Sequence, residues 1–148
     1  MGWKLGDRVP IKGTIWLPKQ GDTWYFNVDA IYGADNFDKT GFYFRYDESV
    51  SANWYAVVTN NSSGITGVTT GVAVGTNTFQ KLRIEVDETA TSAKFYIDNV
   101  LTNTITTNFP GTTRDFGPGV NMRKTNGTTA RTAEVDYLGY WSLMTTTI

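Results

Sequence analysis

Two pairs of acidic residues are the first candidates for chemistry in this sequence. Glu85 and Asp87 are two positions apart, and so are Glu134 and Asp136. Side chains at this spacing in a strand share one face, and a retaining glycosidase needs two carboxyl groups about 5 Å apart. The same spacing is expected for charged residues on the wet face of an amphipathic strand, paired with basic residues of the next strand. Glycoside hydrolysis is therefore one hypothesis, and the pattern by itself assigns no catalytic residue.

Aromatic residues with polar neighbours are the second candidate. They alternate along three runs, so that one set can fill a core, namely Trp24, Phe26, Phe42, Phe44 and Trp54. The other set, Tyr25, Tyr43 and Tyr55, then points outward with Arg45 beside it. Flat amphipathic rings suit sugar faces, because the ring covers C–H groups while polar neighbours bind hydroxyls. Exposed tyrosines also occur in subunit interfaces, so these residues predict either a glycan-binding or a protein-contact platform.

An oxygen-rich run, GADNFDKTG, is the third candidate. Its residues Asp35, Asn36 and Asp38 could supply the carboxylate and carbonyl oxygens that calcium prefers. The same residue types are common turn formers, because their side chains hydrogen-bond to their own backbone. The run is therefore a candidate calcium loop, and nothing in the sequence requires a cofactor.

The composition excludes several kinds of chemistry. The 148 residues include no cysteine and no histidine. Thiol nucleophiles, Cys or His zinc sites and imidazole acid–base catalysis are therefore ruled out, and any catalysis would rest on carboxylates, tyrosines or lysines. With 13 basic and 14 acidic residues, the formal net charge is -1. The chain therefore lacks the broad positive field that would attract nucleic acid or an anionic membrane.

The length and hydropathy of the chain bound its organisation. Residues 1–148 are expected to form a single domain, because 148 residues suffice for one sizeable core. No apolar run reaches membrane-spanning length, and the opening MGWKLGDR lacks the hydrophobic segment of a signal peptide. The sequence therefore predicts neither a membrane span nor a secretory leader.

Strands must position the candidate residues, and residues 81–105 indicate how. Apolar residues such as Leu82 and Ile84 alternate there with charged residues, and a second alternating run surrounds Phe95. The pair Asp98-Asn99 separates this second run from a third. Asp and Asn tolerate the positive φ that a two-residue hairpin turn requires, so a three-strand antiparallel meander is expected. A meander with one wet face must bury the other against a second layer.

The rest of the chain repeats this pattern. Further runs typical of strands occupy residues 8–17, 23–32, 42–47, 54–59, 65–74 and 132–143. Residues 108–119 contain two Pro and three Gly, which predicts an irregular crossover before a short strand at Val120 and Met122. About ten strands with no helix between them predict an all-β fold, an antiparallel two-sheet β-sandwich of jelly-roll type.

Several motifs in this order resemble a known family. The runs FYFRYDESVSANWYAVV, FQKLRIEVD, AKFYIDNVL and PGVNMRKTNGTTARTAEVDYLGYW are similar to concanavalin A-like, laminin-G-like β-sandwiches, over about residues 41–142. More narrowly, they resemble the versions found among bacteriophage virion proteins. The resemblance implies a concanavalin A-like jelly roll, and the fold carries lectins, hydrolases and structural modules alike.

The function expected from this resemblance is a non-enzymatic surface protein of a phage virion. It would be a capsid decoration (cement) subunit or a tail-fibre or receptor-binding module, located in the virion and acting through protein–protein contacts. Its partners would be other virion proteins and further copies of itself in a homo-oligomer, with a trimer among the expected forms. The alternative is a lectin-like carbohydrate-binding module with a cell-surface glycan as partner, and a carboxylate glycoside hydrolase is the third hypothesis.

Overall fold

Alternating polar and apolar residues form two stacked antiparallel sheets in this protein. The computed structural model describes residues 3–4, 9–16, 24–31, 40–60, 64–75, 78–87, 89–110, 115–124 and 133–140, with side chains for 40–60, 66–75, 78–87, 89–110, 120 and 133–139. Every helix or strand within these ranges is a β-strand. The predicted all-β class is therefore confirmed.

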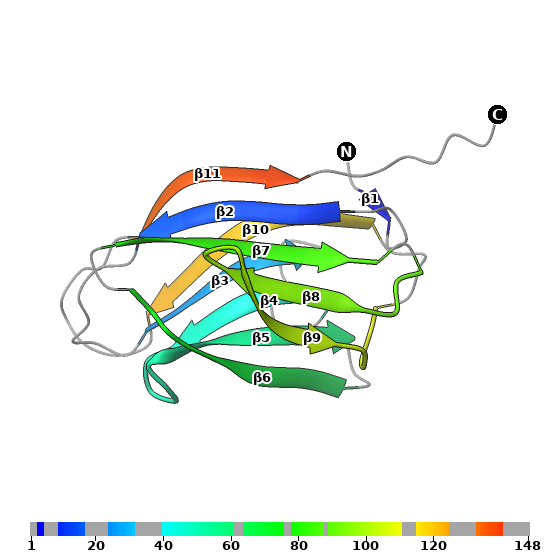
Figure 1. The fold of residues 1–148 in the computed structure, drawn as a ribbon, viewed down its shortest axis with the longest axis horizontal. Coiled ribbons are helices and arrows are strands. Elements are labelled where there is room, and N and C mark those ends of the chain that lie inside the picture. The colour runs from blue at the N-terminus through cyan, green and yellow to red at the C-terminus, as the bar shows by residue number, and fades with distance from the viewer. Residues whose placement is uncertain are drawn as a thin grey trace.

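The six-stranded sheet has the order β1, β10, β3, β4, β5, β6. Its strands are β1 (Trp3–Lys4), β10 (Asp115–Lys124), β3 (Trp24–Ile31), β4 (Thr40–Asp47), β5 (Asn53–Asn60) and β6 (Gly64–Ala73). The five-stranded sheet has the order β11, β2, β7, β8, β9. Its strands are β11 (Glu134–Tyr140), β2 (Val9–Trp16), β7 (Phe79–Val86), β8 (Ala93–Ile97) and β9 (Val100–Ile105). Figure 1 shows one sheet in front of the other, as predicted for a two-sheet jelly roll.

The core lies between the sheets and is aromatic on the side of the six-stranded sheet. Phe42, Phe44 and Trp54 are fully buried there, as their alternation predicts. Phe44 packs edge-on against Phe95 of the five-stranded sheet, with ring centroids 5.3 Å apart and an interplanar angle of 85°. It also meets Trp54 edge-on at 6.3 Å. The ring of Phe44 therefore joins the two layers at the centre of the sandwich.

A buried amide holds the core at one end. Gln80 Oε1 accepts hydrogen bonds from Trp54 Nε1 at 3.0 Å and from the Gly75 backbone N–H at 2.6 Å. Gln80 Nε2 donates to the Ala73 carbonyl at 3.1 Å. A Cβ on Gly75 would collide with Thr78 Oγ1 and crowd the Gln80 side chain, so a larger residue here would displace these side chains. One side chain thus ties β5, the end of β6 and β7 together.

The predicted meander is confirmed as β7, β8 and β9. Leu82 pairs with Ile97, and Ile97 pairs with Val100 across the tight turn. Asp98 and Asn99 adopt φ values of 50° and 68°, the left-handed conformation that a two-residue hairpin turn needs. The Asp98 carboxylate also accepts a hydrogen bond from the Lys81 backbone N–H at 2.9 Å, which fastens the turn to β7.

The expected irregular crossover at residues 108–119 is partly wrong. Strand β10 already begins at Asp115 and continues to Lys124. Pro118 lies within it, opposite Ala30 of β3. On its other side β10 pairs with β1 at Asp115 and Phe116, and among the described strands none pairs with the rest of that side. Proline is tolerated in a strand where one side forms no ladder hydrogen bonds, and this side of β10 has no described partner at Pro118.

Candidate functional site

The outer face of the six-stranded sheet carries a polar and aromatic row across several strands. Arg45 of β4 lies opposite Asn27 of β3 on one side and opposite Tyr55 of β5 on the other. Tyr55 in turn lies opposite Thr69 of β6. Residues that pair in this way share one face of the sheet, at about 4.8 Å per strand. The row Asn27, Arg45, Tyr55 and Thr69, named here the Tyr55 row, therefore spans roughly 14 Å.

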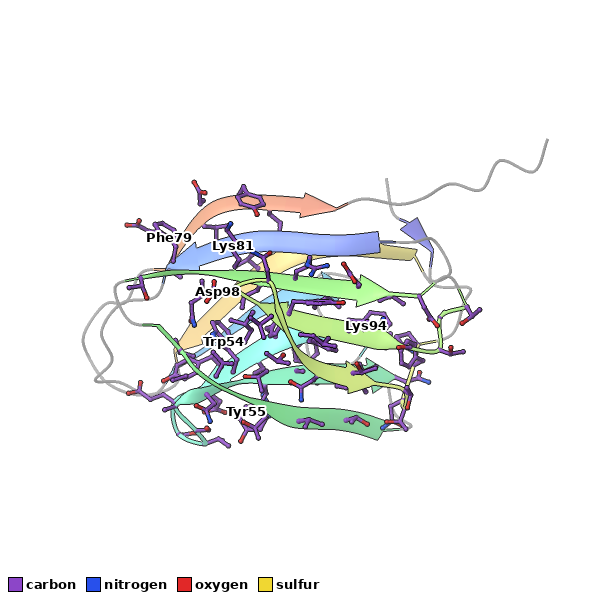
Figure 2. The ribbon with its side chains drawn as sticks, viewed as in Figure 1. Trp54, Tyr55, Phe79, Lys81, Lys94 and Asp98 are labelled. Carbon is purple, nitrogen blue, oxygen red and sulfur yellow. The ribbon has the colours of Figure 1, made fainter. Side chains whose placement is uncertain are left out.

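Arg45 and Tyr55 form the centre of this row. The Arg45 Cζ lies 5.7 Å from the centroid of the Tyr55 ring, within the range of a cation–π contact. Both residues are partly exposed. The preceding residue, Trp54, is buried in the core, and Figure 2 labels both Trp54 and Tyr55. Strand alternation at the core thus sets the outward position of the Tyr55 ring.

The expected exposure of Tyr43 is wrong. This tyrosine belongs to the outer face by register, opposite Asp29 and Val57, yet only 1% of it is exposed. Val57 is also fully buried. Alternation separates the two faces of a strand but does not say whether the second face is wet, and this part of it is dry. Of the predicted platform residues with described side chains, Arg45 and Tyr55 are the two that a ligand could reach.

The remaining predicted binding residues lie outside the described side chains. Tyr25 belongs to β3 and pairs with Asp47, which places its backbone next to β4 on the same sheet. The candidate calcium residues Asp35, Asn36 and Asp38 lie outside the described ranges altogether. The calcium loop stays a prediction.

The two candidate pairs of catalytic carboxylates lie far apart on the five-stranded sheet. Glu85 pairs across the sheet with Pro10, whereas Glu134 pairs with Trp16 six residues along β2, which corresponds to roughly 20 Å. A bulge between Val135 and Tyr137 interrupts the alternation around Asp136. A retaining pair needs about 5 Å, so Glu85 and Glu134 cannot act together.

Glu85 and Asp87 are each engaged in structural contacts. Glu85 forms an ion pair with Arg83 on the same strand face. Asp87 Oδ1 accepts hydrogen bonds from the backbone N–H groups of Thr91 at 2.7 Å and Ser92 at 3.0 Å. Asp87 Oδ2 accepts from the hydroxyls of Thr89 at 2.8 Å and Thr91 at 3.0 Å. Asp87 is thus the organiser of the turn between β7 and β8.

The Asp87 turn should make stability depend on pH. Burial by itself would raise the pKa of the Asp87 carboxyl, but the hydrogen bonds from Ser92, Thr89 and Thr91 together lower it below its ordinary value. A lowered folded-state pKa means that the stabilisation is present above about pH 4 and is lost as the pH falls through the folded-state pKa. We expect Asp87→Asn to lower the free energy of unfolding by about 1 kcal/mol at pH 7, a modest amount because the carboxyl is partly exposed. At pH 3 the loss should be smaller, because part of the stabilisation is already gone in the wild type. Urea unfolding at both pH values measures this, and an equal cost at both would contradict it.

The outer face of the five-stranded sheet holds a second arginine–tyrosine pair, which sequence reasoning missed. Arg83 of β7 lies opposite Tyr96 of β8, and its Cζ stands 3.6 Å from the Tyr96 ring centroid. The same guanidinium forms the ion pair with Glu85. The Arg83 guanidinium therefore covers the Tyr96 ring and is itself neutralised by Glu85. The alternation of Lys81, Arg83 and Glu85 indicates that these side chains share one strand face. The contact of Arg83 with Tyr96 could not be predicted from it, because that contact depends on the register between β7 and β8.

One family model matches most of the chain. The model is described as SO2946-like, C-terminal domain, and it matches residues 23–136. The chain belongs to this family. Its matched segment runs from the start of β3 into β11, and so includes the Tyr55 row and the meander. No curated protein matches the sequence.

Solved structures of similar fold include sugar-binding and sugar-cleaving proteins. A carbohydrate-binding module, CBM66 from Bacillus subtilis, is similar with a TM-score of 0.63 and 12% identity over 90% of this chain and 74% of that chain. Sheep galectin-11 in complex with glycerol has a TM-score of 0.56 and 14% identity over 90% and 95% of the two chains. The beta-glucanase of Bacillus licheniformis has a TM-score of 0.66 and 15% identity over 95% and 67%. At these identities the likeness establishes the fold alone, a concanavalin A-like jelly roll.

These comparisons leave the predicted phage context without support. None of them indicates a bacteriophage origin, so the virion location, the virion partners and the homo-oligomer, trimer included, stay predictions. Within the described ranges no helix is long and apolar enough to cross a membrane.

Proposed function

We propose that this protein is a carbohydrate-binding module that holds a glycan on the Tyr55 row. The observation that carries the proposal is the partly exposed Tyr55 ring with Arg45 beside it at 5.7 Å. An aromatic ring flanked by hydrogen-bonding groups covers the C–H face of a sugar while its neighbours bind hydroxyls. The similar folds named as a carbohydrate-binding module and a galectin support the same function.

The framework behind the Tyr55 row suits a pre-organised site. Strands β4 and β5 are interior strands of the six-stranded sheet, paired on both sides. The residues that precede Arg45 and Tyr55, Phe44 and Trp54, are fully buried and in edge-on ring contact. Side chains on such a framework lose little freedom when a ligand binds, which favours affinity.

The placement of the carboxylates supports binding rather than turnover. Glycoside hydrolysis needs a convergent acid pair, and among the described side chains Glu85 is paired with Arg83 while Asp87 organises a turn. The beta-glucanase of similar fold shows that the scaffold can also carry an enzyme. In this chain we therefore propose a non-enzymatic module.

Truncation of Tyr55 tests the proposal. We expect Tyr55→Ala to weaken binding about 3- to 10-fold or more on a glycan array followed by calorimetry, since an aromatic contact contributes about 0.5–1.5 kcal/mol beyond its area. Tyr96→Ala is the matched control, because Tyr96 is a tyrosine of the opposite sheet already covered by Arg83. Equal binding by wild type and Tyr55→Ala, or an equal loss in Tyr96→Ala, would contradict the proposed site. Absence of any binder on a broad array would contradict the function.

Protein–protein contact is the second candidate function, as expected for a virion surface protein. The observation that favours it is the exposure of Phe79, Val100 and Leu101, which are 48%, 66% and 48% exposed. Figure 2 shows Phe79 near Lys81 and Asp98, at the end of the five-stranded sheet where the turn between β8 and β9 lies. A self-association that is lost in Leu101→Asp would support this function.

A further inference from the structure

We propose that the glycan bound on the Tyr55 row carries a negative charge, and that Arg45 binds its acidic group. This inference rests on the proposed function and adds the class of ligand. The ligand would be a sugar with a carboxylate or a sulfate, placed with its C–H face on Tyr55 and its anionic group on the guanidinium.

The charge of Arg45 has no anionic partner among the described residues. The nearest acid along the strand is Asp47, whose Oδ1 already accepts hydrogen bonds from the Ser49 backbone N–H at 3.1 Å and the Ser49 hydroxyl at 2.6 Å. The other acid at a register position on this face is Asp29, diagonal to Arg45 and opposite Tyr43. A positive group that the fold itself leaves without a described counter-ion favours an anionic ligand.

The other arginine–tyrosine pair shows what a completed arrangement looks like. Arg83 lies 3.6 Å from the Tyr96 ring centroid and is also ion-paired with Glu85. Arg45 lies farther from its ring, at 5.7 Å, and none of the described carboxylates forms an ion pair with it. The two pairs have the same residue types, and among the described side chains an ion pair is formed at Arg83 and none is formed at Arg45. A ligand would supply at Arg45 what Glu85 supplies at Arg83.

The guanidinium of Arg45 is buried at its inner end. Its Nε atom is buried and has no hydrogen-bond partner among the described residues, while the residue as a whole is partly exposed. Because Nε is buried while the residue as a whole is partly exposed, we infer that the outer N–H groups are the donors for a ligand. Two parallel N–H donors match the oxygens of a carboxylate or sulfate, and such charge-assisted bonds are stronger than neutral ones. A neutral sugar would form weaker hydrogen bonds with these two N–H donors.

The test compares three oligosaccharides of equal length: a neutral one, its uronate counterpart and its sulfated counterpart. We expect the wild type to bind an acidic form about 10-fold or more tightly than the neutral form, and to lose this preference in Arg45→Gln. Binding of the acidic form should weaken as salt rises in the wild type and respond less in the variant. The uronate and sulfated arms decide which anion the site prefers.

Two further variants keep the test decisive. Arg83→Gln is the matched control and should leave the preference unchanged, because Arg83 belongs to the other sheet. Arg45→Lys keeps the positive charge but lacks the paired N–H donors of the guanidinium, so it should give an intermediate preference for the acidic form. It replaces Arg45→Gln if that variant does not fold. Equal wild-type affinity for neutral and acidic forms would overturn the inference while leaving the proposed function intact. Failure to bind any of the three, with no hit on a broad array, would overturn the proposed function as well.

Discussion

Phe44→Ala is expected to lower the free energy of unfolding by about 4 kcal/mol. Truncating a fully buried phenylalanine costs about 3–5 kcal/mol, because apolar contact is lost and a cavity remains. Phe44 is fully buried and meets Phe95 of the opposite sheet at 5.3 Å and Trp54 at 6.3 Å, so the cavity would open between the layers. The melting temperature should fall by roughly 10 °C, at about 2–4 °C per kcal/mol for a chain of this size.

Leu101→Ala is the control for this prediction. Leu101 is also apolar but 48% exposed, so its truncation should change stability by less than about 1 kcal/mol. Urea unfolding of both variants measures the difference. A cost below about 1.5 kcal/mol for Phe44→Ala would mean that the two sheets do not pack through this ring.

Gln80→Leu is the second large effect we expect, at about 2–4 kcal/mol. The substitution keeps a side chain of similar size but removes the acceptor shared by Trp54 Nε1 and the Gly75 N–H, and the donor to the Ala73 carbonyl. Each buried polar group that loses its partner costs about 1–3 kcal/mol. The loop after β6 would therefore loosen even though apolar burial is conserved.

A double-mutant cycle separates the Gln80 contact from packing. Trp54→Phe removes the indole N–H while keeping an aromatic ring in the core. If Gln80 and Trp54 act together, the double variant should cost less than the sum of the two single variants by about 1 kcal/mol or more. Strict additivity would show that the 3.0 Å hydrogen bond contributes little.

The strands that could be predicted from sequence are those specified by residues close together in the chain. The alternation around Leu82 and Phe95 and the turn at Asp98-Asn99 specify period and turn chemistry within a few residues, and β7, β8 and β9 follow from them. The core set Phe42, Phe44 and Trp54 was predictable for the same reason. Each of these features depends on near neighbours in the chain.

The features that could not be predicted depend on neighbours in space. Tyr43 belongs to the outer face but is buried, and no local pattern indicates that a second face is covered. Pro118 suggested an irregular segment, and the tolerance of a strand for it depends on the neighbours of β10, which among the described strands leave one side unpaired at Pro118. The stacking of Arg83 on Tyr96 required the register between β7 and β8.

The function of the chain likewise depends on contacts in space more than on local motifs. Ordered motifs resemble concanavalin A-like domains of phage virions, but such motifs specify a scaffold, and a scaffold does not specify a function. The register of β4 and β5 brings Arg45 and Tyr55 together on the outer face of the six-stranded sheet. Carbohydrate binding therefore replaces protein contact as the leading proposal.

The most direct test is a nuclear magnetic resonance titration of the labelled protein with the oligosaccharide that binds best on the array. We predict that backbone amide shifts change most at Arg45, Tyr55 and Thr69, on the outer face of the six-stranded sheet. Amides of Arg83 and Tyr96, on the opposite sheet, should stay unchanged. Changes centred on Arg83 and Tyr96, or scattered over both sheets, would contradict the Tyr55 row as the binding site.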